Sequence, residues 1–252
     1  MLLLDLPEEC FLHIASFLAV QDVCAAAATC RQLSAYVQDD SLWQRLAEAK
    51  WGSKVLEVTQ EAPPEKWSTY CKHRMAFKSN KQSPFQLVQE QYSDPWQHLA
   101  CCLMCSRTTG GAVIRQTIED FLREYTRPTD LLCADAQGVM AQLNALGLQD
   151  VRWKALSRMS HDFLAKAWSD PSEFWGCGPF ARDSWQIFCC GRTSAKGVTD
   201  VALLRYLHWL NTGATAERKP AKKRTAGVQA ARGKRRPPPS ASVRITRSRA
   251  KR

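Results

Sequence analysis

The sequence contains no apolar run that approaches the length of a membrane-spanning helix, which needs about 20 consecutive apolar residues. Its first residues, MLLLDLPEEC, carry acids where a secretory signal peptide needs positive charge. These absences predict an intracellular protein with no membrane partner.

The chain has no net positive charge before its C-terminal segment. Residues 213–252 contain fourteen Lys and Arg against one acid, Glu217, whereas residues 1–212 contain 21 basic and 23 acidic residues. The body of the protein therefore lacks a global basic field. Attraction to nucleic acid must come from local patches or from this tail.

Metal-ligating patterns are also sparse, although the chain has eleven cysteines. Several cysteines lie on apolar helical faces and are interpreted as buried, reduced thiols. Cys102 and Cys105 have CxxC spacing, but no second CxxC or His pair lies nearby. Because a structural zinc site takes four ligands, we expect core thiols here and no metal.

Residues 2–51 contain three predicted short helices. The first follows Leu6-Pro7, with Phe11, Ile14, Ala15 and Leu18 at helical spacing; the others cover Asp22 to Cys30 and Ser41 to Trp51. This order of features resembles an F-box. The resemblance implies binding of the Skp adaptor of cullin-RING ubiquitin ligases, through a surface that begins at Leu6 and Pro7. The alternative is a small helical module that only packs against the rest of the chain.

Residues 53–82 form the expected connector between an F-box at 1–52 and a second domain at 83–212. Pro63-Pro64 stops any helix, and Lys66 to Met75 is predicted to form a short helix with Trp67 and Tyr70 facing inward.

The second domain is predicted to be helical throughout, so the fold class is all-α. The 45% apolar content of the whole chain is sufficient for a core. The predicted helices begin at Pro95, Ile114, Asp130 and Asp150, and Gly147 is expected to end the third of them.

The stretch from Phe174 to Leu210 has the most informative pattern. Gly176-Cys177-Gly178 forms a tight turn before a helix whose buried face holds Trp185, Phe188 and Cys189. Asp200 begins another helix, with a predicted apolar stripe of Val201, Leu204, Leu207 and Leu210. Taken alone, an Asp at a helix start is usually an N-cap.

Several motifs together resemble the helix-hairpin-helix DNA glycosylases, and among them the methyl-CpG-binding mismatch glycosylases that remove thymine and uracil opposite guanine. They are SPFQLVQE (83–90), DPWQHL (94–99), SRTTG (106–110), LGLQDVRWK (146–154) and the hairpin and Asp200 segments. The resemblance implies that Asp200 is the catalytic carboxylate and that Gln89 reads the edge of the flipped base. It also implies that Arg107, beside Thr108, fills the space left by that base, while Gly176, Cys177 and Gly178 contact DNA. Without the resemblance, Arg107 would be interpreted as a solvated loop residue.

The sequence departs from this family at two positions. Phe180 stands in the base pocket where the mismatch glycosylases have tyrosine and bifunctional relatives have a Schiff-base lysine. Phenylalanine cannot form a Schiff base, so hydrolysis without strand cleavage is expected. Pro179 replaces a basic residue. No cysteine follows Cys190, which excludes the iron–sulfur cluster of endonuclease III-like relatives, so no cofactor is expected.

Residues 213–252 are predicted to be a disordered basic tail. Residues 222–224 and 233–236 contain basic clusters that indicate either nuclear localisation or a phosphate-binding arm. The sequence therefore predicts a nuclear, monofunctional glycosylase that acts as a monomer on mismatched double-stranded DNA. The alternative is a non-catalytic F-box substrate receptor that uses the glycosylase fold to recognise DNA or chromatin.

Overall fold

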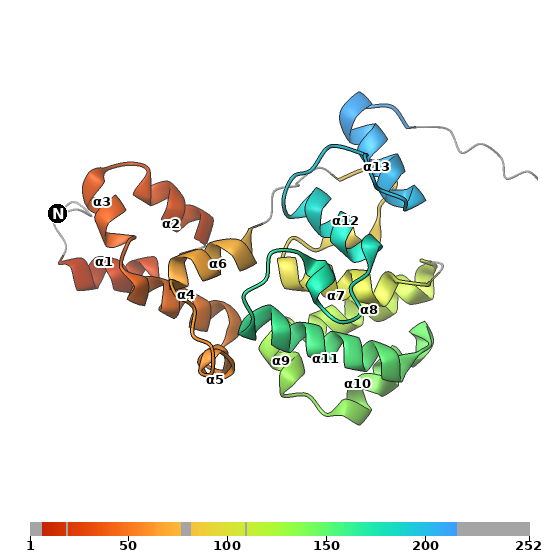
Figure 1. The fold of residues 1–252 in the computed structure, drawn as a ribbon, viewed down its shortest axis with the longest axis horizontal. Coiled ribbons are helices and arrows are strands. Elements are labelled where there is room, and N and C mark those ends of the chain that lie inside the picture. Colours follow the sequence, from red (N-terminus) through yellow and green to blue (C-terminus); the bar gives the residue numbers. More distant parts are fainter. Residues whose placement is uncertain (1–6, 19, 77–81, 109, 216–252) are drawn as a thin grey trace, which may run out of the picture. The chain divides into compact units, whose positions relative to one another are not determined.

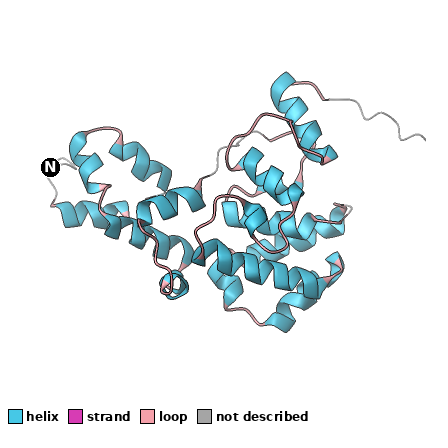
Figure 2. Ribbon diagram, in the orientation of Figure 1, coloured by secondary structure: helices cyan, strands magenta, loops and turns pink. Residues whose placement is uncertain are grey.

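The computed structural model describes residues 7–18, 20–76, 82–108 and 110–215. Within these ranges the chain forms helices and loops and no strand (Figure 2), which confirms the predicted all-α fold class. None of the described helices is long and apolar enough to cross a membrane. The elements labelled in Figure 1, with three short 3-10 helices, are α1 (Glu8–Ala15), α2 (Val20–Ala27), α3 (Arg31–Tyr36), α4 (Asp40–Trp51), α5 (Lys54–Thr59), α6 (Trp67–Met75), η2 (Val88–Gln91), α7 (Pro95–Cys105), α8 (Ala112–Glu124), α9 (Pro128–Leu132), α10 (Ala136–Leu143), η3 (Asn144–Leu146), α11 (Gln149–Ala165), η4 (Pro171–Glu173), α12 (Pro179–Phe188) and α13 (Val201–Thr212).

The N-terminal helices pack around α4. Trp43 is completely buried, and its indole Nε1 donates a hydrogen bond to the Val37 carbonyl at 2.7 Å. The second helix, expected to reach Cys30, ends at Ala27 instead. The Cys30 sulfur accepts a hydrogen bond from the Leu33 amide and caps the additional helix α3.

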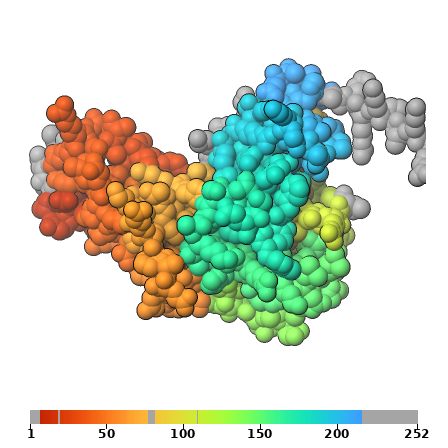
Figure 3. All heavy atoms as spheres, viewed as in Figure 1, coloured from red at the N-terminus to blue at the C-terminus, as the bar shows by residue number. Residues whose placement is uncertain are grey.

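The connector contributes to the core. The Tyr70 hydroxyl of α6 donates to the Leu164 carbonyl of α11 at 2.9 Å, and Arg74 Nε donates to the Phe163 carbonyl at 2.6 Å. Figure 3 shows the orange spheres of this segment against the green spheres of the later helices. Trp51, Tyr70 and Phe163 belong to one apolar cluster, so the N-terminal helices and the later helices share a core.

In the later part of the chain, local capping determines the helix boundaries. Asp94 caps α7 by accepting from the Gln97 amide at 3.0 Å, and Pro95 occupies the first turn. The single helix expected from Asp130 to Leu146 is divided into α9, α10 and η3. The division arises because Asp135 accepts from the Gly138 amide at 2.8 Å and begins a new helix. Gly147 follows with φ +68°, which confirms its predicted capping position.

Candidate functional site

Asp200 is the N-cap of α13. Its Oδ1 accepts a hydrogen bond from the Leu203 amide at 2.9 Å, and its side chain is half-buried. The cap therefore holds a carboxylate at the positive end of the helix, where negative charge is favoured.

The predicted stripe of α13 is confirmed at Leu207, and in part at Leu204 and Leu210, but is wrong at Val201. Leu203, Tyr206 and Leu207 are completely buried, whereas Val201 is 70% exposed. Tyr206 packs on Phe188 of α12 with ring centroids 4.7 Å apart. This aromatic contact turns the helix so that Val201 faces solvent.

The loop before Asp200 is fixed by Arg192, which no sequence pattern singled out. Its guanidinium donates to Gln186 Oε1 at 2.7 Å and to the Ser194 carbonyl at 3.0 Å. It also lies 3.7 Å from the carboxylate of Asp183, which is 1% exposed. Asp200 is thus presented by an ordered loop.

Gln89 lies in η2 and is 4% exposed. The segment before it is held by Glu90, whose carboxylate accepts from the Ser83 amide at 2.7 Å and from the Leu87 amide at 3.2 Å. The Gln89 carbonyl lies 3.2 Å from Nδ1 of His98 in α7. The position of Gln89 is therefore fixed from two sides.

His98 joins this segment to the helix that follows the hairpin. A carbonyl only accepts, so Nδ1 carries the proton and Nε2 accepts from the Ser184 hydroxyl of α12 at 2.9 Å. Ser184 also interacts with the Cys102 thiol. Complete burial lowers the pKa of His98 to about 4, so the ring is neutral at physiological pH. Sequence reasoning missed His98; the available signal was a polar residue within the apolar run WQHLACCLMC.

The two hairpin glycines have different environments. Gly176 has φ +92°, and a Cβ there would lie 2.8 Å from the Cβ of Ala155 in α11. Glycine at this position therefore allows the hairpin to pack closely against α11. A Cβ on Gly178 would meet open space. Cys177 is 7% exposed, and burial raises the pKa of its thiol to about 12. At the surface, the hairpin therefore presents Gly176 and Gly178, which are exposed.

Three segments that carry predicted pocket residues meet at a small apolar cluster. Phe180, the second residue of α12, packs against this cluster, as does Leu87 from the Gln89 segment. Leu203, whose amide donates a hydrogen bond to the Asp200 side chain, belongs to the same cluster. Gln89, Phe180 and Asp200 therefore all lie on segments that converge here.

Arg107 follows the C-terminal end of α7 and is exposed, with φ +59°. This left-handed conformation costs a non-glycine residue about 1–2 kcal/mol. The hydroxyl of half-buried Thr108 donates to the Cys105 carbonyl at 2.8 Å and so stabilises the turn. Neighbouring Thr109 lies outside the described residues.

All eleven cysteines carry free thiols. Cys101 and Cys102 are completely buried, and the sulfurs of Cys101 and Cys105 lie 3.8 Å apart. The hydrogen bond from Cys101 lowers the pKa of Cys105. Among the described residues, no group of three or more His, Cys, Asp or Glu could hold a metal ion.

The N-terminal helices expose a second candidate surface. Pro7 is exposed, and its carbonyl accepts from the Phe11 amide at 3.1 Å; Leu6 lies outside the described residues. Large apolar side chains are exposed at and beyond the C-terminal end of α1: Ile14 by 43%, Phe17 by 77% and Leu18 by 40%. Ile14 and Leu18 are thus exposed, whereas Phe11 and Ala15 are part of the core.

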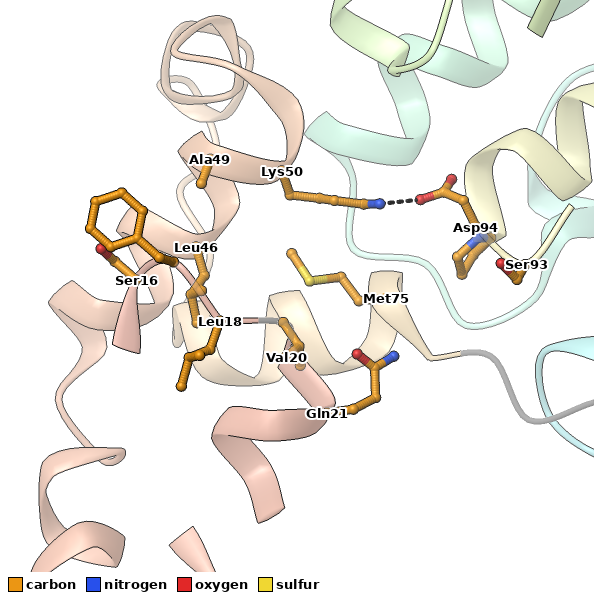
Figure 4. A pocket seen from close by; sticks show the side chains of 12 residues that line it. Ser16, Leu18, Val20, Gln21, Leu46, Ala49, Lys50, Met75, Ser93 and Asp94 are labelled. Atoms are coloured by element: carbon orange, nitrogen blue, oxygen red, sulfur yellow. Dashed lines mark ion pairs between the residues drawn. The ribbon is translucent and has the colours of Figure 1, made fainter. Parts of the chain in front are cut away.

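Phe17 and Leu18 line a cavity of about 530 Å³ whose wall also includes Leu46 and Met75 (Figure 4). At its edge, Lys50 of α4 forms an ion pair with Asp94 at 2.7 Å. An apolar surface of this kind on a folded domain usually marks a binding site.

Comparison with known proteins shows which domain family the N-terminal segment matches. Residues 3–49 match the sequence model of the F-box-like family, so the chain carries an F-box-like domain at its N-terminus. It is also similar to two Arabidopsis thaliana proteins. The "Methyl-CpG-binding domain protein 4-like protein" is 30% identical over 129 residues, which cover 51% of this chain and 29% of that protein. The "Putative F-box protein PP2-B6" is 35% identical over 51 residues, which cover 20% of this chain and 17% of that protein. The chain therefore spans less than a third of the length of either relative.

Proposed function

We propose that this chain is a monofunctional DNA glycosylase that removes thymine or uracil opposite guanine, and that its F-box-like domain binds a Skp adaptor. The main support is that the three segments carrying Gln89, Phe180 and Asp200 meet at one apolar cluster, through Leu87, Phe180 and Leu203. The partial similarity to the methyl-CpG-binding domain protein 4-like protein supports the same proposal.

The proposed reaction begins with extrusion of the target base, at a cost of a few kcal/mol. The Gln89 amide offers both a donor and an acceptor to the edge of thymine or uracil. Its backbone carbonyl is anchored by His98, which fixes the point from which the side chain extends. Arg107 would enter the space that the base leaves.

Asp200 supplies the chemistry in this proposal. As the glycosidic bond breaks, positive charge develops on the sugar, and a fixed carboxylate stabilises it. A water molecule then adds its hydroxyl to the anomeric carbon, and its proton passes to the departing base. Phe180 carries no amine, so no covalent enzyme intermediate forms and the abasic strand stays intact.

The experiment is base release from G:T, G:U and matched duplexes, with abasic sites cleaved by alkali. Asp200→Asn is the decisive variant, because asparagine is also a good N-cap and should preserve the bond to the Leu203 amide. It should retain DNA binding and lose at least about a hundredfold in base release. Asp135→Asn makes the same change at the N-cap of α10 and should remain active.

The rival function is a non-catalytic F-box receptor for DNA or chromatin. It is favoured by Phe180, which lacks a pocket hydroxyl, and by Pro179, which contributes no backbone donor to the hairpin. Mismatch-dependent DNA binding by the wild-type chain without base release from any duplex would establish this alternative.

A further inference from the structure

Two exposed side chains are carried on left-handed backbone at neighbouring loop tips. Arg107 has φ +59°, and Leu148, which is 53% exposed, has φ +53°. Arg107 follows α7, and Leu148 precedes α11. A bulky residue such as leucine keeps this conformation only where its surroundings impose it.

Arg152 of α11 imposes the left-handed conformation at both loop tips. Its side chain is 6% exposed, and Nη2 donates to the Ser106 carbonyl at 2.9 Å while Nε donates to the Gly147 carbonyl at 2.9 Å. These carbonyls belong to the peptide units that immediately precede Arg107 and Leu148. Fixing those peptide planes therefore fixes the direction from which each tip residue leaves the backbone.

The remaining donors of Arg152 complete the attachment. Nη1 donates to the carbonyls of Leu103 at 2.7 Å and Met104 at 3.0 Å, and Nη2 also reaches the Leu146 carbonyl at 3.3 Å. Three of the five carbonyls lie at the C-terminal end of α7, where carbonyls lack helical partners and favour positive charge. Lysine cannot reproduce this planar fork of donors.

We propose that Arg152 is a positioning residue that holds Arg107 and Leu148 as a rigid pair of prongs against duplex DNA. This inference rests on the proposed glycosylase function and adds the device that makes base extrusion efficient. Arg152 touches neither base nor sugar, so its loss affects extrusion while leaving the catalytic carboxylate in place.

The test separates extrusion from chemistry. A duplex with 2-aminopurine beside a G:U pair reports unstacking by fluorescence, and the Asp200→Asn background removes base release from the measurement. Adding Arg152→Lys should lower the extrusion equilibrium by about tenfold to a hundredfold. Adding Arg74→Lys should leave it unchanged, although Arg74 is also buried and donates to carbonyls at the far end of α11.

Equal effects of Arg152→Lys and Arg74→Lys would overturn the proposal, because Arg152 would then contribute only stability. Absence of both fluorescence change and base release in the otherwise unaltered chain would instead refute the glycosylase function itself.

If Arg152→Lys does not fold, Leu148→Gly and Leu148→Ala provide the test. Glycine suits positive φ better than alanine, so the glycine variant should melt at the higher temperature. Glycine also frees the tip, so it should extrude the base less than the alanine variant. If extrusion instead follows melting temperature across the pair, rigid tips are not required and the inference is wrong.

Discussion

The buried histidine of α7 should make folding sensitive to mild acid. An unfolded histidine has a pKa near 6.5, whereas burial lowers the pKa of His98 to about 4. The folded state therefore resists protonation, and the unfolded state gains a proton first as the pH falls. Stability is fully present above about pH 6.5 and is lost progressively toward pH 4, which gives about 2 kcal/mol between pH 7 and pH 5.

The assay is urea denaturation at pH 7 and pH 5, with His98→Gln as the comparison. The variant should be less stable at pH 7, because it lacks the imidazole ring that hydrogen-bonds to both the Ser184 hydroxyl and the Gln89 carbonyl. Its further loss of stability between the two pH values should be smaller than that of the wild type by about 2 kcal/mol. His208→Gln removes an exposed histidine and should retain the wild-type difference, because His98 is intact.

Two results would refute this reasoning. Equal pH dependence in wild type and His98→Gln would show that His98 does not contribute to acid sensitivity. A direct NMR titration of the wild-type ring, which does not depend on a folded variant, should show no protonation of His98 between pH 8 and pH 5. A midpoint above pH 6 would contradict the inferred neutral bridge between Gln89 and Ser184.

Three further predictions concern the proposed chemistry, the tail and the F-box-like domain. Borohydride should trap no covalent DNA adduct, since Phe180 has no amine; a trapped band on a denaturing gel would reveal a substitute lysine. Removal of residues 217–252 should preserve single-turnover base release at saturating DNA. It should also weaken binding, flatten its salt dependence and reduce nuclear accumulation; loss of chemistry at saturation would place the tail in the active fold. Phe17→Ala should abolish co-purification with a Skp adaptor and change the melting temperature by only a few degrees. Trp43→Ala should instead destabilise the chain by about 3–5 kcal/mol; similar behaviour of the two variants would contradict a separate adaptor surface.

The parts of the fold that sequence predicted are those with local causes. Asp94 and Pro95 start α7, and Gly147 ends η3, because capping depends on residues within one turn. Asp200 likewise begins α13 as expected. Amphipathic spacing also predicted the buried face of α12, on which Trp185 and Phe188 are 7% and 1% exposed. Both signals depend only on residues that are close in sequence, so they can be recognised without knowing the tertiary contacts.

The supports of the candidate site could not be predicted in this way. His98 meets Ser184 across 86 positions, and Arg152 meets the Ser106 carbonyl across 46. Such contacts have no period in the sequence and depend on how whole helices pack. The exposure of Val201 on α13 was missed for the same reason, because the contact of Tyr206 with Phe188 decides which face is buried. The resemblance to a family implied which residues would meet DNA, but not the groups that hold them.

The shared core determines how the two proposed activities have to be separated. Trp51 is 1% exposed, packs edge-on against Tyr70 with ring centroids 5.6 Å apart, and also contacts Phe163 of α11. The Trp51 carbonyl additionally accepts a hydrogen bond from the Thr129 hydroxyl of α9. Deleting residues 1–52 would therefore expose apolar surface of the later helices and leave the Thr129 hydroxyl without this partner. Because the resulting loss of base release would reflect unfolding, only substitutions at exposed positions such as Phe17 can test adaptor binding independently of catalysis.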